Sequence, residues 1–244
     1  MKICVVGFGT VGKAQAHLLK ELGHQVFAYD PYVLPKSELE KQVELTFVCT
    51  PENTVEEVLR ELMAKKAQGL FVIKSTTPIG TTERLMQNYK IHICHNPEFL
   101  REAHRYEDVL KPERVIIGQC CQAHGRLLAE LYSPLNKPIF LTTPTASELA
   151  KLTSNAYLST LITFWNEIAE LTEKLSLNAK EVAELVCADQ RMSKYGTARF
   201  REPFSGKCLP KDLDSLILTF HQFNLNPIVF NGIKKYNRRF QDLC

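Results

Sequence analysis

The stretch that decides the fold of this chain is Lys2-Ile3-Cys4-Val5-Val6-Gly7-Phe8-Gly9-Thr10-Val11-Gly12. Residues 2–6 are typical of a buried parallel strand, and residues 13–22 are typical of a helix. The glycines between them suit a bound pyrophosphate. Gly7 permits a tight turn, Gly9 lets the backbone approach the ligand, and Gly12 lets helix and strand pack closely. Because N–H groups at a helix start attract anions, the stretch predicts a dinucleotide site.

Asp30 identifies the dinucleotide. It follows the next predicted strand, residues 25–29. A carboxylate at that position can accept hydrogen bonds from both ribose hydroxyls, and it would repel a 2′-phosphate. The sequence therefore predicts NAD, not NADP, as the cofactor. The alternative interpretation is a glycine turn that holds no ligand.

Strands and helices alternate as far as about residue 142. Further strands are expected at residues 45–49, 70–73, 91–94, 115–117 and 139–141, with helices at residues 54–66 and 123–132. This alternation is typical of an α/β fold, a Rossmann-type doubly wound parallel sheet. We therefore predict an NAD-binding domain in residues 1–142.

After residue 142 the pattern becomes helical. Thr145-Ala146-Ser147-Glu148 has the form of a capping box, and an apolar helix pattern follows over about residues 149–175. Further helices are expected at residues 179–187 and 212–223. Residues 143–244 are thus predicted to form an all-α domain for dimerisation and substrate binding.

The composition limits the classes of binding partner and the cellular location that we expect. The net charge of +3 is too small and too dispersed to favour nucleic acid, although anionic small molecules remain plausible partners. Eight cysteines show no CxxC pair and no metal-ligand spacing, so we expect no metal. Several of them lie in apolar strand patterns, which favours a reducing cytoplasm. Because the sequence has neither a signal peptide nor an apolar run of about 18 residues, we expect no membrane span.

Five residues are candidates for catalytic or binding roles. Lys151 and Asn155 share one face of the long helix and could hold an oxyanion, or they could form a solvated face. Glu98 follows a strand and could take a proton or position water, or it could be a surface residue. Cys208 is a candidate nucleophile or a buried structural thiol. Asp212 could be a base, or it could simply begin the next helix.

Together these segments resemble the UDP-glucose/GDP-mannose dehydrogenase family of nucleotide-sugar dehydrogenases. The resemblance covers nearly the whole chain, in the family's order. Its blocks are the glycine motif with Asp30, Lys74-Ser75-Thr76-Thr77-Pro78-Ile79-Gly80, Asn96-Pro97-Glu98-Phe99-Leu100-Arg101-Glu102, Glu148-Leu149-Ala150-Lys151-Leu152-Thr153-Ser154-Asn155-Ala156 with Asn166-Glu167-Ile168-Ala169, and Cys208-Leu209-Pro210-Lys211-Asp212.

The resemblance implies a four-electron oxidation of a sugar C6 alcohol to a carboxylate with two NAD, as in UDP-glucose 6-dehydrogenase and polysaccharide biosynthesis. Cys208 would attack the aldehyde intermediate and form a thioester. The resemblance also implies the remaining roles: protons and water for Glu98, Asp212 and Thr76; the oxyanion and substrate for Lys151 and Asn155; NAD contacts for Val11, Thr50, Thr76 and Lys211; and the sugar site for Phe99, Leu100, Arg101 and Glu102. The helix from about residue 147 would form a homodimer core through Leu158, Leu161, Phe164, Trp165 and Ile168.

The sequence also departs from the family pattern. We expect a short form without the C-terminal domain that grips the nucleotide, because about 30 residues follow Asp212. Ser205 stands where the family has a glycine. Because remote contacts help to drive the reaction, these departures leave two alternatives open. The chain could be an NAD-dependent dehydrogenase of a smaller alcohol or hydroxyacid, or a non-catalytic NAD-binding relative.

Overall fold

The structure is a computed structural model that describes residues 1–100, 105–206 and 208–241. Contacts divide the chain into two compact units, Met1–Lys151 (the N-terminal unit) and Leu152–Cys244 (the C-terminal unit). Within the described ranges, every helix is too short or too polar to cross a membrane.

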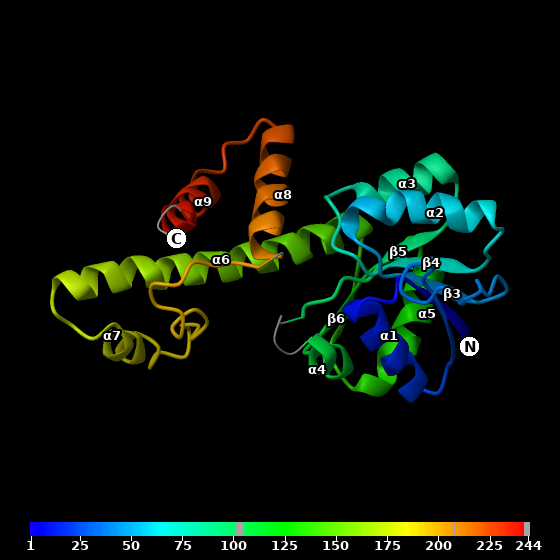
Figure 1. Ribbon diagram of the computed structural model, residues 1–244, viewed down its shortest axis with the longest axis horizontal. Coiled ribbons are helices and arrows are strands. Elements are labelled where there is room, and N and C mark those ends of the chain that lie inside the picture. The colour runs from blue at the N-terminus through cyan, green and yellow to red at the C-terminus, as the bar shows by residue number, and fades with distance from the viewer. Residues whose placement is uncertain (101–104, 207, 242–244) are drawn as a thin grey trace. The chain divides into compact units, whose positions relative to one another are not determined.

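The N-terminal unit is built on a seven-stranded sheet in the described part of the chain (Figure 1). Its order is β2-β1-β3-β4-β5-β6-β7. The strands are β1 (Lys2–Val6), β2 (Gln25–Tyr29), β3 (Leu45–Val48), β4 (Leu70–Ile73), β5 (Ile93–His95), β6 (Val115–Gly118) and β7 (Ile139–Thr142). The prediction of an α/β doubly wound sheet is confirmed.

One strand pairing corrects the expectation of an all-parallel sheet. β6 runs antiparallel to β5, and the two are joined at the single pair His95↔Gly118. The sequence predicted the strand positions to within two residues, but it did not predict the direction of β6, because a buried apolar strand looks alike in both directions.

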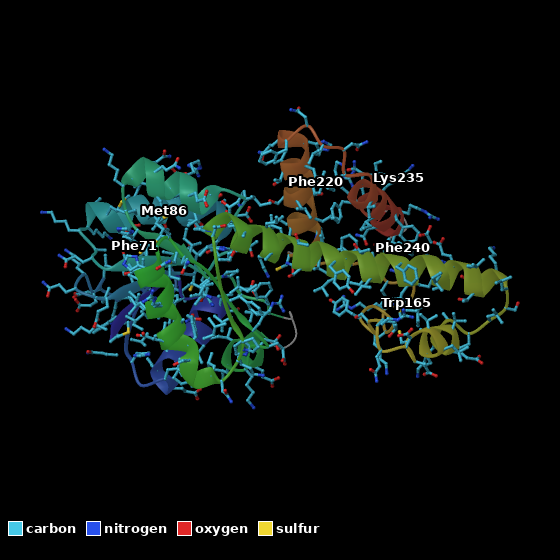
Figure 2. All side chains as sticks on the ribbon, turned by 180° about the vertical axis from the view of Figure 1, so that it is seen from behind. Phe71, Met86, Trp165, Phe220, Lys235 and Phe240 are labelled. Carbon is cyan, nitrogen blue, oxygen red and sulfur yellow. The ribbon has the colours of Figure 1, made fainter. Side chains whose placement is uncertain are left out.

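Helices cover both faces of this sheet, as Figure 1 shows. One face carries α1 (Thr10–Glu21), α4 (Arg105–Leu110) and α5 (Gln122–Tyr132), and the other carries α2 (Val55–Ala64) and α3 (Thr81–Tyr89). Strand side chains alternate between the faces. Ile3 and Val5 pack in the core on the α1 side, and Cys4 and Val6 pack in the core on the α2 side. Phe71, labelled in Figure 2, also lies in this second core.

Two helices of this unit were not predicted. α3 has nine residues and buries only Thr82 and Leu85. α4 has only six residues. Short 3₁₀ turns, Glu52–Thr54 and Ser133–Leu135, complete the connections.

The C-terminal unit is helical where the structure describes it. Its helices are α6 (Pro144–Lys174), whose first turns belong to the N-terminal unit, α7 (Ala179–Val186), α8 (Leu209–Gln222) and α9 (Ile228–Gln241). Trp165, labelled in Figure 2, packs with Ala183 and Cys187 of the α7 segment and with Phe200. Trp165 is therefore only 3% exposed, and it adds little to the apolar surface expected on this helix.

The predicted capping box is wrong. α6 begins at Pro144, and the Ala146 N–H is held by the Thr143 hydroxyl at 3.2 Å. Proline suits the first position of a helix, because its missing N–H would have had no intrahelical partner. Glu148 consequently lies inside the helix, where its carboxylate serves a different purpose.

Candidate cofactor and active site

The N-terminal unit has a topological switch point beside β1. β1 pairs with β2 on one side and with β3 on the other, so the chain leaves the carboxyl ends of these strands in opposite directions. Doubly wound sheets bind ligands in the crevice at such a point. Gly7 occupies it with φ at 86°, and a Cβ there would lie 2.8 Å from Thr50 Cγ2. Gly7 and Thr50, predicted from distant segments, are therefore neighbours.

The start of α1 has the form of a pyrophosphate cradle. A Cβ on Gly12 would lie 1.9 Å from the carbonyl oxygen of Gly7, so only glycine permits this close packing. A Cβ on Gly9 would meet nothing within 4 Å, which leaves space in front of the helix. No side chain caps α1, and its first turn, which holds Val11, carries no acidic residue. Its N–H groups can therefore serve an anionic ligand.

Asp30 lies at the end of β2 as predicted. Its Oδ2 accepts the Phe8 N–H at 2.7 Å, and its Oδ1 accepts the N–H groups of Tyr32 and Val33, each at 3.0 Å. Burial opposes the charge, but the three N–H groups outweigh it and hold the pKa of Asp30 below its usual value. Because each carboxylate oxygen has two lone pairs, Oδ2 keeps acceptor capacity for a ribose hydroxyl.

Thr76 lies between two anchored residues. The Ser75 hydroxyl donates to the Thr50 carbonyl at 2.5 Å, and the Thr77 hydroxyl donates to Glu148 at 3.1 Å. Thr76 itself is half-buried. Its backbone is thereby fixed next to Thr50, at the carboxyl ends of β3 and β4.

Glu98 and Lys151 form a shielded ion pair. Their charged atoms lie 3.4 Å apart, with side-chain exposures of 16% and 4%. The Leu100 N–H donates to the other Glu98 oxygen at 2.6 Å, and the Lys151 ammonium lies 5.3 Å from the centre of the Phe99 ring. Lys151 is therefore not part of a solvated helix face. Arg101 and Glu102, expected beside the substrate, lie outside the described residues.

The sequence interpretation missed a buried network next to this pair. The Lys74 ammonium donates to Asn96 Oδ1 at 2.8 Å, and the Tyr132 hydroxyl donates to the same oxygen at 2.7 Å. Burial lowers the pKa of Lys74 to about 8, although Glu98 acts in the opposite direction. Both Lys74 and Asn96 lie in the quoted motifs without an assigned role. The available signal was a lysine directly after a buried strand.

This network borders a cavity of about 470 Å³ within the N-terminal unit. Its lining includes Lys74, Asn96, Glu98, Phe99 and Tyr132. The buried cation and the acceptor groups therefore face a space large enough for a small ligand.

The C-terminal unit gathers the second set of predicted residues. The Asn155 amide donates to Asp212 Oδ2 at 2.5 Å, and the Lys211 ammonium lies 2.7 Å from Asp212 Oδ1. Asp212 is 1% exposed, and its N–H donates to the Cys208 carbonyl at 2.9 Å. Cys208 is the N-cap residue of α8 and is exposed, so the interpretation as a buried structural thiol is wrong.

The predicted site residues thus form two groups. The N-terminal unit holds the glycine motif, Asp30, Thr50, Thr76, Glu98 and Lys151, and the C-terminal unit holds Asn155, Cys208, Lys211 and Asp212. The roles of both groups stay predictions.

Comparisons with known proteins agree with this architecture. Residues 33–136 match the NAD-binding domain of the UDP-glucose/GDP-mannose dehydrogenase family, and residues 145–239 match its central domain. Residues 1–61 also match the NAD-binding domain of D-isomer specific 2-hydroxyacid dehydrogenases.

Individual relatives give the same result. UDP-glucose 6-dehydrogenase of Rickettsia typhi is 33% identical over 177 residues, which cover 69% of this chain and 41% of that enzyme. GDP-mannose 6-dehydrogenase of Azotobacter vinelandii is 27% identical and covers 97% of this chain and 68% of its own length. A UDP-glucose dehydrogenase structure from Pyrobaculum islandicum superposes with a TM-score of 0.86 at 23% identity, covering 98% of this chain and 68% of that one.

The fold, the glycine cradle and these matches define a chain with an NAD-binding domain of the type found in dehydrogenase families. The chain belongs to the UDP-glucose/GDP-mannose dehydrogenase family. It spans about 41% of the length of the Rickettsia typhi relative.

Proposed function

We propose that this chain oxidises the C6 alcohol of a nucleotide sugar resembling UDP-glucose to the carboxylate, through a thioester on Cys208. The observation that carries the proposal is a polar cluster beside Cys208, the N-cap residue of α8. Lys211 and Asp212 lie in the first turn of α8, and Asn155 of α6 donates to Asp212. The cluster unites residues up to 57 positions apart in the sequence. A thiol with only a structural role would not require these polar residues in and beside the first turn of its helix.

Cys208 would act as the nucleophile. The positive end of the α8 dipole and the nearby Lys211 ammonium both favour its thiolate. The thiolate would add to the aldehyde carbon and form a C–S bond. Loss of a hydride from that carbon would give the thioester, and water would then cleave the C–S bond and return the thiolate. The whole reaction consumes one alcohol, one water and two NAD⁺, and it yields one carboxylate, two NADH and three protons.

Glu98 and Lys151 would handle charge and protons. The Lys151 ammonium would stabilise the negative oxygen that develops when the thiolate adds. Glu98, oriented by the Leu100 N–H, would accept a proton from the alcohol or from water. Asn155 would add a donor to the oxyanion, and Asp212 would serve as a base.

The cofactor is NAD, which accepts a hydride in each of the two oxidations. We propose that the α1 start at Gly9 and Val11 binds the pyrophosphate and that Asp30 binds the ribose. Thr50 and Thr76 would line the crevice, and Lys211 would be a further cofactor contact. The open space at Gly9 and the uncapped helix support this placement.

The same proposal includes a homodimer through α6. Tyr157, Phe164 and Leu171 are spaced seven residues apart and are 55%, 49% and 54% exposed. This spacing aligns them in one stripe along the helix, which is the pattern of a helix that packs against a second copy.

The decisive experiment measures NADH formed per sugar. We expect about two NADH per UDP-glucose, and no reduction with any of several nucleotide sugars would overturn the proposal. Cys208→Ser should lose nearly all turnover while binding NADH normally. Cys187→Ser changes a buried thiol of the same unit, and it should keep turnover. Normal rates in Cys208→Ser would exclude the thioester.

A second candidate function is a single oxidation of a smaller alcohol or hydroxyacid. It is favoured by the match of residues 1–61 and by the Glu98–Lys151 pair, which requires no thiol. It predicts a fully active Cys208→Ala and one NADH per alcohol. A non-catalytic relative would bind NADH and reduce NAD⁺ with none of the alcohols.

A further inference from the structure

A cluster of two histidines and two cysteines lies where β5 begins and β6 ends. The ligand atoms of His92, Cys120, Cys121 and His124 all lie within 4.8 Å of one another. His124 Nδ1 lies 3.1 Å from Cys120 Sγ and 3.3 Å from Cys121 Sγ, and His92 Nδ1 lies 3.7 Å from Cys120 Sγ. From these residues we propose a structural zinc site that is separate from the cofactor crevice.

The distances suit a tetrahedral zinc ion. Zinc–sulfur bonds are about 2.3 Å and zinc–nitrogen bonds about 2.0–2.1 Å. Tetrahedral geometry then separates sulfur from nitrogen by about 3.6 Å and sulfur from sulfur by about 3.8 Å. The three sulfur–nitrogen separations lie within about 0.5 Å of the first value, and all four ligand atoms lie within 4.8 Å of one another, so side-chain rotations that move these atoms by about 1 Å would complete the site.

The ligand types also select the metal. Thiolate and imidazole are zinc ligands, whereas magnesium and calcium prefer oxygen. Two thiolates would balance the two charges of Zn²⁺, and two neutral imidazoles would complete four-coordination. Four protein ligands leave no open position for a substrate, so the geometry indicates a structural ion.

The fold explains how residues distant in sequence meet. His92 directly precedes β5, and Cys120 and Cys121 follow β6. Because these strands are antiparallel, the start of β5 lies beside the end of β6. His124 is added by the first turn of α5, for which Cys121 is the N-cap residue. This edge of the sheet is opposite the carboxyl ends of β1 and β3, where the cofactor crevice lies.

The site would strengthen the weakest junction of the sheet. β5 and β6 share one registered pair, whereas the neighbouring junctions β4–β5 and β6–β7 share three and four. An ion bound to His92 on one side and to the two cysteines on the other would link the strands directly. This gives the metal a structural role at the place where the backbone ladder is shortest.

The cluster has one competing explanation. Cys94 Sγ lies 3.7 Å from Cys120 Sγ, so oxidation could join these two cysteines in a disulfide. A disulfide would remove Cys120 from the ligand set. It would leave His124 and Cys121 without a reason to converge.

The test uses the whole chain, purified without a histidine tag or chelator under reducing conditions. Elemental analysis should find one zinc per chain, and Co²⁺ added to the metal-free protein should give a thiolate-to-cobalt charge-transfer band. Cys121→Ser and His124→Gln should bind zinc at least about 100-fold more weakly, since loss of a residue that only hydrogen-bonds to a metal ligand already costs about 10- to 100-fold. Both side chains are half-buried, so these variants should fold.

Matched controls are Cys208→Ser and His221→Gln, an exposed cysteine and an exposed histidine in the other unit. They should keep one zinc per chain. Three results would each overturn the proposal. They are a wild-type chain that binds neither zinc nor cobalt, full zinc in Cys121→Ser and His124→Gln, and a Cys94–Cys120 disulfide that persists in the metal-free chain despite the reducing conditions. If a variant fails to fold, the cobalt spectrum of the wild-type chain decides.

Discussion

Thr82 donates both its backbone N–H, at 2.8 Å, and its hydroxyl, at 2.6 Å, to one carboxylate oxygen of Glu148. The Gly80 N–H donates to the other oxygen at 2.6 Å. Glu148 of α6 therefore caps the start of α3, where the helix dipole favours a negative charge. Burial raises the pKa of Glu148, and the hydrogen bonds act against that rise.

Glu148→Gln should destabilise the N-terminal unit by about 2–3 kcal/mol. The amide keeps the shape of the side chain, but its NH₂ group would face N–H donors and leave them unsatisfied. Urea unfolding measures the loss. Glu173→Gln on the same helix is the control, because its carboxylate is 67% exposed and should contribute less than about 1 kcal/mol. Equal effects of the two changes would contradict the capping role.

His95 should make stability depend on pH. The ring is fully buried, with Nε2 donating to the Ser75 carbonyl at 3.3 Å and Nδ1 accepting from the Ser147 hydroxyl at 2.9 Å. Burial lowers its pKa to about 3. Between pH 6.5 and 3 the unfolded chain binds a proton here that the folded chain does not, so the free energy of unfolding falls as the pH falls.

The slope of this term is about 1.4 kcal/mol per pH unit. From pH 7 to pH 5 the wild type should lose about 2 kcal/mol more than His95→Gln. The measurement compares urea unfolding at both values. His221→Gln, an exposed change, should keep the wild-type slope. Parallel slopes for wild type and His95→Gln would show that His95 does not resist protonation in the folded chain.

Asp30→Ala should weaken NADH binding by about tenfold or more, since a charge-assisted hydrogen bond to ribose is lost. The preference over NADPH should shrink, because the charge that repels the 2′-phosphate is gone. Fluorescence titration of both nucleotides measures this. Glu21→Ala at the other end of α1 should bind like wild type. Unchanged NADH affinity in Asp30→Ala would mean that the ribose contact is misassigned.

Asp212→Asn should lower turnover at least about 100-fold, the usual contribution of a general base. NADH affinity should change much less. Asp214→Asn lies two residues further along α8, and its carboxylate is 52% exposed in an ion pair with Lys234. Turnover in that variant should match wild type. If both variants lose activity alike, Asp212 acts only through the stability of α8.

The sequence predicted elements that are encoded locally. The strands and the turn at Gly7, Gly9 and Gly12 can be predicted from a few consecutive residues, because the apolar pattern and the glycine positions are local features of the sequence. The direction of β6 was not predictable, since it depends on partners far along the chain. α3 was missed because a carboxylate from α6 supports it, and short-range periodicity does not report such a contact.

The contacts of the site residues also depend on partners far along the chain. The Asn155–Asp212 contact was not predicted. The resemblance assigned a catalytic role to each residue, but the spacing of Lys151 and Asn155 describes one helix face and does not identify the partner. The cluster of His92, Cys120, Cys121 and His124 was also not predicted from the sequence. Three of its ligands lie within residues 120–124, but the fourth, His92, is brought beside them only by the antiparallel pairing of β5 and β6.

The uncapped start of α1 has a practical consequence. The Glu148 carboxylate already occupies the first turn of α3, so added oxyanions cannot bind there. At the start of α1 they would bind at the site proposed for the cofactor pyrophosphate. Sulfate and phosphate buffers should therefore raise the apparent KM for NAD competitively. Kinetic tests of the proposed activity would best be done in buffers whose anions are bulky or absent.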